Sequence, residues 1–127
     1  MRALLDTHTL LWWLEDRSRL SPRARQTIED RRNEALVSAA SAWEIAIKHR
    51  SRKLQVAALV ADFNRILELA GFKELGISVA HAVRAGNLSG AHKDPFDKML
   101  VAQAQMEKLS IVSVDKIFDK YGVQRIW

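Results

Sequence analysis

The sequence predicts an α/β fold, a three-layer sandwich in which helices flank a mainly parallel central sheet. The first observation is that short apolar runs of strand length, such as 2–6 and 34–39, alternate with longer segments of helical periodicity. The second is that these runs are apolar almost throughout, as expected for strands that are buried on both faces. Alternation of such strands with helices is typical of a parallel sheet covered on both sides.

The first half of the chain is expected to form two strands and three helices. Ser21 suits the N-cap of a helix and Pro22 its first turn, so a helix is predicted to start there. In order, we expect a strand at 2–6, helices at 7–16 and 21–32, a strand at 34–39 and a helix at 41–50.

The second half begins with the clearest helical pattern. Apolar residues at 59–70 follow the i, i+3, i+4, i+7 spacing, and Gly71 is expected to end that helix. The segment 94–109 is apolar on most faces, which predicts a largely buried helix. We further expect strands at 73–77, 110–115 and 123–127, a helix at 78–86, a loop at 87–93, and a short helix or turn at 116–122.

Length and composition are those of one soluble domain. At 127 residues and 48% hydrophobic, residues 1–127 are expected to form a single domain with its own core. No apolar stretch reaches the length of a membrane span, and an acidic residue comes too early for a signal peptide, so we expect a cytoplasmic protein. With no cysteine, any metal must be held by Asp, Glu or His, which favours Mg²⁺ or Mn²⁺.

Basic residues outnumber acidic ones by 20 to 15, which favours a polyanionic partner without establishing one. The densest basic run is "KHRSRK" at 48–53. It is open to two interpretations, the cationic C-terminal end of a helix or a set of phosphate contacts. The candidates for contacting the phosphates of a nucleic acid such as RNA are Lys48, Arg50, Arg52 and Lys53.

Four acidic residues fall where strands end or helices begin. Asp6 closes the first predicted strand and Asp115 closes the strand at 110–115, whereas Glu44 and Asp97 are placed in the first turns of helices. In an open α/β sheet, ligands bind beyond the carboxyl ends of the strands. These acids are therefore expected to converge at one edge of the sheet.

Each acid also has an interpretation that is only structural. Asp6 and Asp115 suit N-caps, Asp94 suits the cap of the last long helix, and Glu44 fits a capping box with Ser41 or a pair with Lys48. Caps alone would place mutually repelling carboxylates at one edge, however. Crowded, partly buried carboxylates must hold protons or gather around a cation, which favours a site with one or two Mg²⁺ or Mn²⁺ ions.

At this point the sequence resembles the PIN-domain ribonucleases, and more closely the VapC-type toxins of type II toxin-antitoxin systems. Four pieces, which occur in the family's order and span nearly the whole chain, carry the resemblance. They are "LLDTHTLLWWL" at 4–14, "VSAASAWEIAIKHRSRKL" at 37–54, "HKDPFDKMLVAQA" at 92–104 and "IVSVDKIFDKYGV" at 111–123.

The resemblance implies a PIN-like sandwich and metal-dependent hydrolysis of RNA phosphodiesters, often in transfer or ribosomal RNA. It assigns the catalytic and metal-binding roles to Asp6, Glu44, Asp97 and Asp115, with Asp119 open as an alternative fourth acid. Hydrolysis of this kind leaves a 3′-hydroxyl and a 5′-phosphate. The resemblance also implies a homodimer and a VapB-type antitoxin as partner.

Several neighbouring residues are candidates for auxiliary roles. Thr7 and Ser113 lie close to the acids and are candidates for orienting a carboxylate or a water, and Asp94 is a cap or an outer group. His92, two residues before Asp94, is a candidate for protonating a leaving group or contacting phosphate. Trp12, Trp13, Phe63, Phe72 and Trp127 are expected mostly in the core.

Two alternatives remain open. A magnesium-dependent phosphatase of the haloacid dehalogenase type is suggested faintly by "DTHTL", although His8 and Leu10 replace the second aspartate and the threonine of its signature. A nucleic-acid-binding or receiver-like module with an acidic pocket, but without cleavage, is the non-enzymatic alternative.

Overall fold

The computed structural model describes residues 1–90 and 93–127, and their centre is a parallel five-stranded sheet. The strand order is β3-β2-β1-β4-β5, and each neighbouring pair is parallel. The strands are β1 (Arg2–Leu5), β2 (Glu34–Ser38), β3 (Lys73–Leu75), β4 (Ser110–Val112) and β5 (Arg125–Ile126). The predicted α/β class is confirmed.

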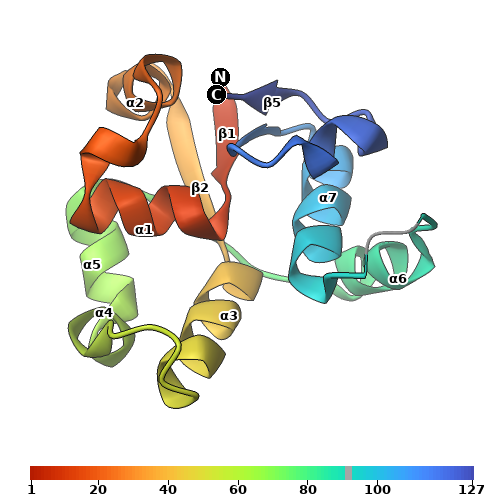
Figure 1. The fold of residues 1–127 in the computed structure, drawn as a ribbon. Helices are drawn as coiled ribbons and strands as arrows, with labels where there is room; N and C mark the ends of the chain where they lie inside the picture. The colour runs from red at the N-terminus through yellow and green to blue at the C-terminus, as the bar shows by residue number, and fades with distance from the viewer. Residues whose placement is uncertain (91–92) are drawn as a thin grey trace.

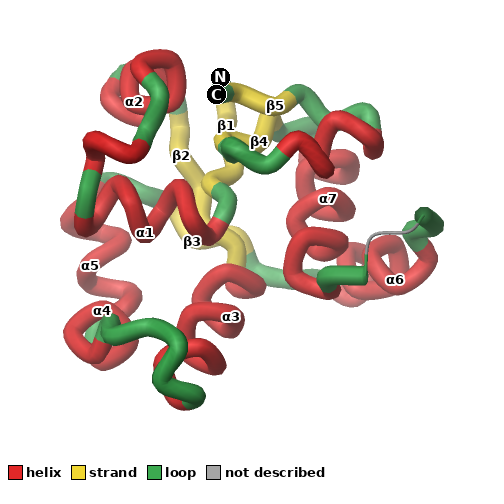
Figure 2. The backbone as a smooth tube through the Cα atoms, viewed as in Figure 1, coloured by secondary structure: helices red, strands yellow, loops and turns green. Residues whose placement is uncertain are grey.

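Helices cover both faces of this sheet (Figure 1). One face carries α1 (Thr7–Glu15), α2 (Pro22–Glu29), α4 (Ala57–Ala61) and α5 (Phe63–Ala70). The other carries α7 (Pro95–Glu107), with α6 (Val79–Asn87) packed against it. Helix α3 (Ala39–Arg50) extends from the carboxyl end of β2, and the strands lie between the helical layers (Figure 2). Short 3₁₀ helices form at Arg17–Arg19 and Lys116–Tyr121.

Alternate residues of the central strands supply two separate cores. On β1, Ala3 and Leu5 pack with the α1, α2 and α5 layer, whereas Leu4 packs with α7. The period of two in a strand produces this division, since successive side chains point to opposite faces. Trp13 and Phe72 are buried as expected, and Trp12, Phe63 and Trp127 are partly buried against the same core.

Three predicted helix starts are confirmed by their capping contacts. The Ser21 hydroxyl accepts a hydrogen bond from Ala24 N at 3.1 Å, with Pro22 in the first turn. The Asp94 carboxylate accepts from the first turn of α7, where Pro95 is the first residue. Ser78 caps α6. Gly71 ends α5 with φ of 81°, a backbone conformation that glycine adopts without steric cost.

The helix predicted at 59–70 was wrong as a single element. It is divided into α4 and α5 at Asp62, whose backbone is not helical at φ −142° and ψ 47°. Both halves bury side chains in the same core, where Leu59 and Leu67 are 7% and 3% exposed. The break at Asp62 thus separates two short helices that pack on the same core.

The start of α3 also differs from the prediction. Strand β2 ends at Ser38, whose hydroxyl accepts from Ala40 N at 3.0 Å, so the helix begins directly after the strand. Ser41 and Glu44 therefore lie inside α3 and form no capping box, and Glu44 is not in the first turn. A capping box is present instead at the start of α6, between Ser78 and His81.

The order of the strands fixes where a ligand site belongs. Crossovers run outward from β1 through β2 to β3 on one side and through β4 to β5 on the other, so the direction of winding reverses between β1 and β4. In open α/β sheets, ligands bind beyond the carboxyl ends of the strands at this switch point. Asp6 and Ser113 directly follow β1 and β4.

No helix within the described ranges is long and apolar enough to cross a membrane.

Candidate active site

Asp6 occupies the switch point and has both carboxylate oxygens engaged. Its Oδ1 accepts from Thr7 N at 2.8 Å and so caps α1, and its Oδ2 accepts from the Ser113 hydroxyl at 2.7 Å. The side chain is held by two elements distant in sequence, since β1 and β4 are neighbours in the sheet. Asp6 is 6% exposed, so its carboxylate is held in place and largely removed from solvent.

Burial raises the pKa of Asp6 above its ordinary value of 3.8, and the negative charge of Glu44 acts in the same direction. The hydrogen bonds from Ser113 and Thr7, together with the charge of His8, lower that pKa but do not cancel the effect of burial. The structure thus holds a carboxylate whose ionised form is destabilised by lost solvation. A cation beside it would relieve that cost.

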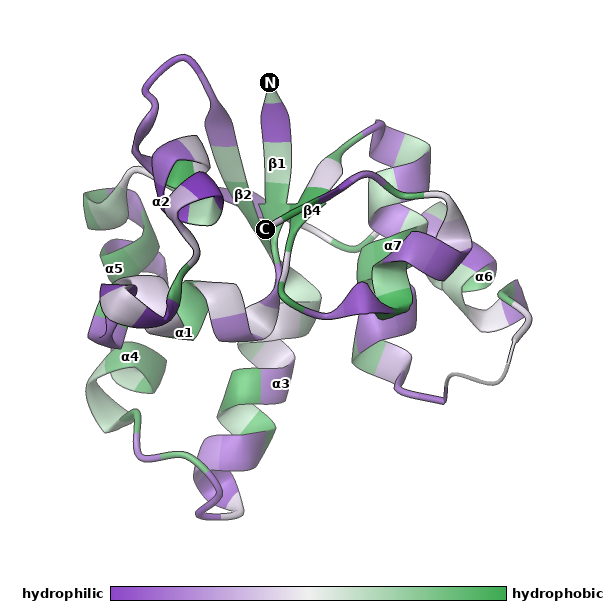
Figure 3. Cartoon of the chain, turned by 45° about the horizontal axis from the view of Figure 1, so that its top comes forward, coloured by the Kyte–Doolittle hydropathy of each residue, from purple (hydrophilic) through white to green (hydrophobic). Residues whose placement is uncertain are grey.

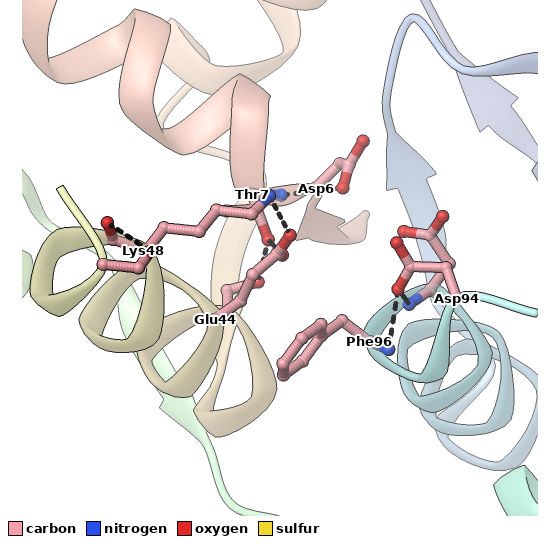
Figure 4. A network of polar contacts seen from close by, with 9 residues as sticks. Asp6, Thr7, Glu44, Lys48, Asp94 and Phe96 are labelled. Carbon is pink, nitrogen blue, oxygen red and sulfur yellow. Dashed lines mark hydrogen bonds and ion pairs between the residues drawn. The ribbon is translucent and has the colours of Figure 1, made fainter. Parts of the chain in front are cut away.

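Glu44 lies in the middle of α3, facing Asp6 (Figure 4). It is 7% exposed, and its Oε1 accepts from the Thr7 hydroxyl at 2.7 Å. Its Oε2 forms an ion pair with Lys48 Nζ at 2.6 Å, one turn further along the helix. The i, i+4 pair considered from the sequence is therefore present. Lys48 supplies the charge that balances this buried carboxylate.

Thr7 and Ser113 connect the acids to one another. The Thr7 hydroxyl lies 2.9 Å from Ser41 Oγ and donates to Glu44, while its backbone N–H donates to Asp6. Ser113 donates to Asp6 and accepts from Asp115 N at 2.9 Å. Both hydroxyls are buried. These contacts fix the rotamers of two carboxylates, which is the arrangement that a preorganised metal or phosphate site requires.

The third acid comes from α7, on the opposite side of the site. Asp94 Oδ1 accepts from Phe96 N and Asp97 N at 2.9 and 3.1 Å, which fixes the first turn of the helix. Asp97 is half-buried in that turn, on the same stripe as Val101, which is buried. The sequence prediction that Asp94 starts the helix is confirmed, and Asp97 lies one position past Phe96.

The remaining acids face solvent. Asp115 is exposed, and its Oδ1 accepts from Ile117 N at 3.0 Å, which caps the 3₁₀ helix at Lys116–Tyr121. Asp119 is occupied by Arg125, which donates to both of its oxygens at 3.0 and 3.3 Å. Asp115 is connected to Asp6 through Ser113, whereas Asp119 forms an ion pair with Arg125.

The chemistry of these donors fits a hard divalent cation, because they are carboxylate and hydroxyl oxygens around a buried carboxylate of raised pKa. Within residues 1–90 and 93–127, however, no three His, Asp or Glu side chains form a group that could hold a metal ion. The structure brings Asp6 and Glu44 together through Thr7 and connects Asp115 through Ser113. It keeps Asp94 on a separate helix (Figure 4).

Most of the basic residues of 48–53 lie at the end of α3. Lys48, His49 and Arg50 are in its last turn, and Arg50, Arg52 and Lys53 are exposed. Figure 3 shows hydrophilic residues gathered at this end of α3. The cations therefore occupy the helix C-terminus, where they complement the dipole, and their exposure leaves them available for phosphates. His92, predicted as an auxiliary residue, lies outside the described residues.

Sequence reasoning missed an aromatic pair beside the acids. Trp43, which directly precedes Glu44, contacts Phe96, which directly precedes Asp97, with ring centroids 5.3 Å apart and an interplanar angle of 78°. Trp43 is 63% exposed. The signal in the sequence was the position of each aromatic residue next to a candidate acid, a relation that becomes spatial only when α3 meets α7.

This fold and its acidic switch point define the class of the protein. The family model described as the PIN domain matches residues 3–124. The chain belongs to the PIN-domain family, and the haloacid dehalogenase interpretation is not retained. Among curated proteins, it is 31% identical to ribonuclease VapC22 of Mycobacterium tuberculosis over 116 residues, which cover 90% of this chain and 87% of that protein.

Solved structures have the same fold. The structure of VapBC2 from Rickettsia felis, bound to a DNA fragment from its promoter, matches with a TM-score of 0.71 at 13% identity, covering 98% of this chain and 97% of that one. VapBC-1 from nontypeable Haemophilus influenzae matches with a TM-score of 0.67 at 13% identity, covering 98% and 96%.

Proposed function

We propose that this protein is a VapC-type toxin, an endoribonuclease that hydrolyses RNA phosphodiester bonds with Mg²⁺ or Mn²⁺. The observation that carries the proposal is the buried Asp6, tied to Glu44 through Thr7 at the switch point of a PIN-domain sheet. The similarity to ribonuclease VapC22 supports ribonuclease activity. Structured transfer or ribosomal RNA is the proposed substrate.

Asp6, Glu44, Asp97 and Asp115 are the residues proposed to hold one or two ions. A divalent cation held by these carboxylates would act as a Lewis acid and would lower the pKa of water. Asp6 is already fixed and poorly solvated, so it gains most from a cation. The first turn of α7 presents Asp97 from the other side.

The surrounding side chains have distinct proposed roles. Thr7 and Ser113 hold the carboxylates of Glu44 and Asp6 in fixed orientations. Lys48 balances the charge of Glu44, so a metal that uses Glu44 must compete with this lysine. Exposed Arg50 and Lys53 at the end of α3 are proposed to contact the RNA backbone.

A VapB-type antitoxin is the proposed inhibitor, and a homodimer is the proposed assembly. The support is that the structural neighbours named above are complexes of VapB with VapC proteins. An antitoxin encoded immediately upstream of this gene would support the toxin role at little cost.

The test is cleavage of total transfer and ribosomal RNA by the purified protein, with Mg²⁺ or Mn²⁺ and with EDTA. Expected products appear only with metal, and they carry 5′-phosphates, so sequencing of 5′ ends locates the cut. Cleavage that persists in EDTA would contradict the metal-dependent mechanism. Binding of RNA with no cleavage under any metal would leave the non-catalytic module as the function.

A further inference from the structure

A pocket of about 340 Å³ lies beside the acidic site, between α3, α6 and α7. Aromatic, aliphatic and two lysine side chains line it. The principal lining residues are Trp43, Ile77, Lys93, Phe96, Lys98 and Met99. A volume of this size is in the range of small-ligand pockets and is large enough for one nucleotide unit.

Two aromatic rings form one corner of this pocket. Trp43 and Phe96 meet edge to face at 78°, with centroids 5.3 Å apart. Because the contact with Phe96 uses an edge-to-face geometry and the side chain is 63% exposed, an indole face remains open to solvent. Figure 4 shows the Phe96 ring projecting from α7 toward α3, on the side of Glu44. An open aromatic face beside a second ring suits a flat, aromatic ligand.

The position of the pocket ties it to the cleavage site. Trp43 directly precedes Glu44 in α3, and Phe96 directly precedes Asp97 in α7. Successive side chains of a helix point in different directions, so the pocket and the proposed metal-binding acids lie on neighbouring faces of the same two helices. A strand bound at the acids can therefore place an adjoining nucleotide in the pocket.

The positive charge of the pocket favours an anionic ligand. Lys93 and Lys98 line it from the segment before α7 and from its first turns, in a chain of net charge +5. Ammonium groups next to an apolar, aromatic wall match a nucleotide, which carries a phosphate beside a flat base. An apolar peptide or a second copy of this face would leave the two cations facing like charge or apolar atoms.

We propose that this pocket binds one unstacked base of single-stranded RNA next to the cleaved bond, with the base on Trp43 and its phosphate near Lys93 and Lys98. The inference rests on the proposed ribonuclease function and adds to it the place in the fold that holds a base beside the cut. Single-stranded loops present such bases, and aromatic side chains stack on them.

The experiment measures binding in EDTA, where cleavage does not interfere. The probe is a fluorescein-labelled ten-nucleotide oligoadenylate, and the matched probe is an abasic ribose-phosphate chain of equal length. Loss of a stacking ring weakens binding by roughly 5- to 150-fold per base. We expect Trp43→Leu to weaken oligoadenylate binding within that range and to leave the abasic probe unchanged, and Trp43→Phe to restore most of the affinity.

Ile47→Ser is the matched control, because Ile47 is also an exposed apolar residue of α3, at 44%, but does not line the pocket. It should leave both affinities at the wild-type value. Lys98→Gln should reduce the slope of log affinity against log salt by about 0.7, the expected loss of one phosphate contact on a single strand.

Three outcomes would overturn the inference. They are unchanged oligoadenylate binding by Trp43→Leu, an equal loss for both probes, and conversion of a dimer to monomers by Trp43→Leu in sedimentation, which would make this face a protein interface. Cleavage by the wild type with Mn²⁺ is measured separately. Absent cleavage with Trp43-dependent binding contradicts the ribonuclease proposal alone, whereas cleavage with Trp43-independent binding contradicts the pocket alone.

Discussion

Asp6 and Asp115 have the same local role in two very different surroundings. Each follows a strand of the sheet, and each accepts a backbone hydrogen bond that caps the helix after it, from Thr7 N for Asp6 and from Ile117 N for Asp115. Asp6 is buried beyond the carboxyl ends of β1 and β4, at the start of α1, and burial raises its pKa, whereas Asp115 is exposed to solvent.

The difference shows that capping and ligand binding are not competing explanations of an acidic residue. A carboxylate can satisfy a helix terminus with one oxygen and still carry an ionised form that the protein solvates poorly. Asp6 is in that condition here, because burial raises its pKa while one of its oxygens caps α1. Glu44 is buried as well, but it is paired with Lys48. The exposed Asp115 and the half-buried Asp97 are proposed to complete a metal site that the buried acids begin.

The largest expected effect is the loss of cleavage in Asp97→Asn, a change at a half-buried residue that should leave folding intact. Asp97→Asn keeps the size of the side chain and removes its charge, and Asp94 continues to cap α7. We expect cleavage to fall by more than roughly 100-fold, the upper range for loss of an outer metal partner. The melting temperature should stay within about 2 °C of the wild type, because an exposed or half-buried site contributes less than ~0.5 kcal/mol. Initial cleavage rates and thermal melts check both.

Asp94→Asn is the control for that variant, because asparagine caps as well as aspartate. It should retain both the melting temperature and most of the cleavage rate. Equal losses in the two variants would show that the first turn of α7 acts as a unit and that Asp97 has no separate role.

The second effect concerns the stability of a variant at the buried Asp6. Asp6→Asn removes a poorly solvated charge, while its amide oxygen still accepts from Thr7 N and its amide group faces Ser113, whose hydroxyl can accept. We expect the metal-free variant to melt higher than the wild type, by roughly 3–5 °C for each kcal/mol gained. Mn²⁺ should raise the melting temperature of the wild type and not that of the variant.

The pH dependence of that gain has a definite sign. Because the folded-state pKa of Asp6 is raised above 3.8, the folded protein binds the proton more tightly than the unfolded chain does. Its contribution to stability is complete below pH 3.8 and is lost as pH rises through the raised pKa. The difference in melting temperature between Asp6→Asn and the wild type should therefore shrink as pH falls toward 4, and a constant difference would contradict the assignment.

A smaller effect concerns the balance of charge around Glu44. Lys48→Met removes the cation that pairs with Glu44 but keeps most of the side-chain length. A metal that uses Glu44 then meets no competitor, so Mn²⁺ affinity should rise by roughly three- to fivefold, within the ~1 kcal/mol of a partly exposed pair. Isothermal titration measures it. Lys53→Met makes the same charge change at an exposed position and should leave the affinity unchanged, and a weaker affinity in Lys48→Met would remove the competition argument.

The sequence predicted the sheet and most helix ends because these depend on local signals. Apolar runs identified the strands, and Ser21, Asp94 and Gly71 marked helix ends through hydrogen bonds within a few residues. The break at Asp62 depends on how two short helices share a core with the sheet, which periodicity does not record. The start of α3 moved because β2 connects to it without a loop, so Ser38 took the role that Ser41 was predicted to have.

The sequence named four residues that the structure brings together, but it did not give their geometry. Asp6, Glu44, Thr7 and Ser113 were named because strand ends and helix starts gather at one edge of a parallel sheet. Their role in a metal site stays a prediction. The pair of Glu44 with Lys48 was expected from their i, i+4 spacing, whereas the inward direction of Glu44 toward Thr7 depends on how α3 is rotated against α1. The contact of Trp43 with Phe96 requires α3 to pack near α7, and the sequence of neither helix predicts that packing.

The smallest effect decides which exposed acid belongs to the site. Asp115→Ala loses the cap of the 3₁₀ helix at Lys116–Tyr121 and should cost about 1 kcal/mol in urea unfolding, whereas Asp115→Asn keeps the cap and should stay within ~0.5 kcal/mol. Asp115→Asn should still slow cleavage, by roughly tenfold, because Ser113 connects Asp115 to Asp6. Asp119→Asn should not slow cleavage, since both oxygens of Asp119 already accept from Arg125. If Asp119→Asn slowed cleavage more than Asp115→Asn, the ion pair with Arg125 would have to open during catalysis, and Asp119 would be the fourth acid.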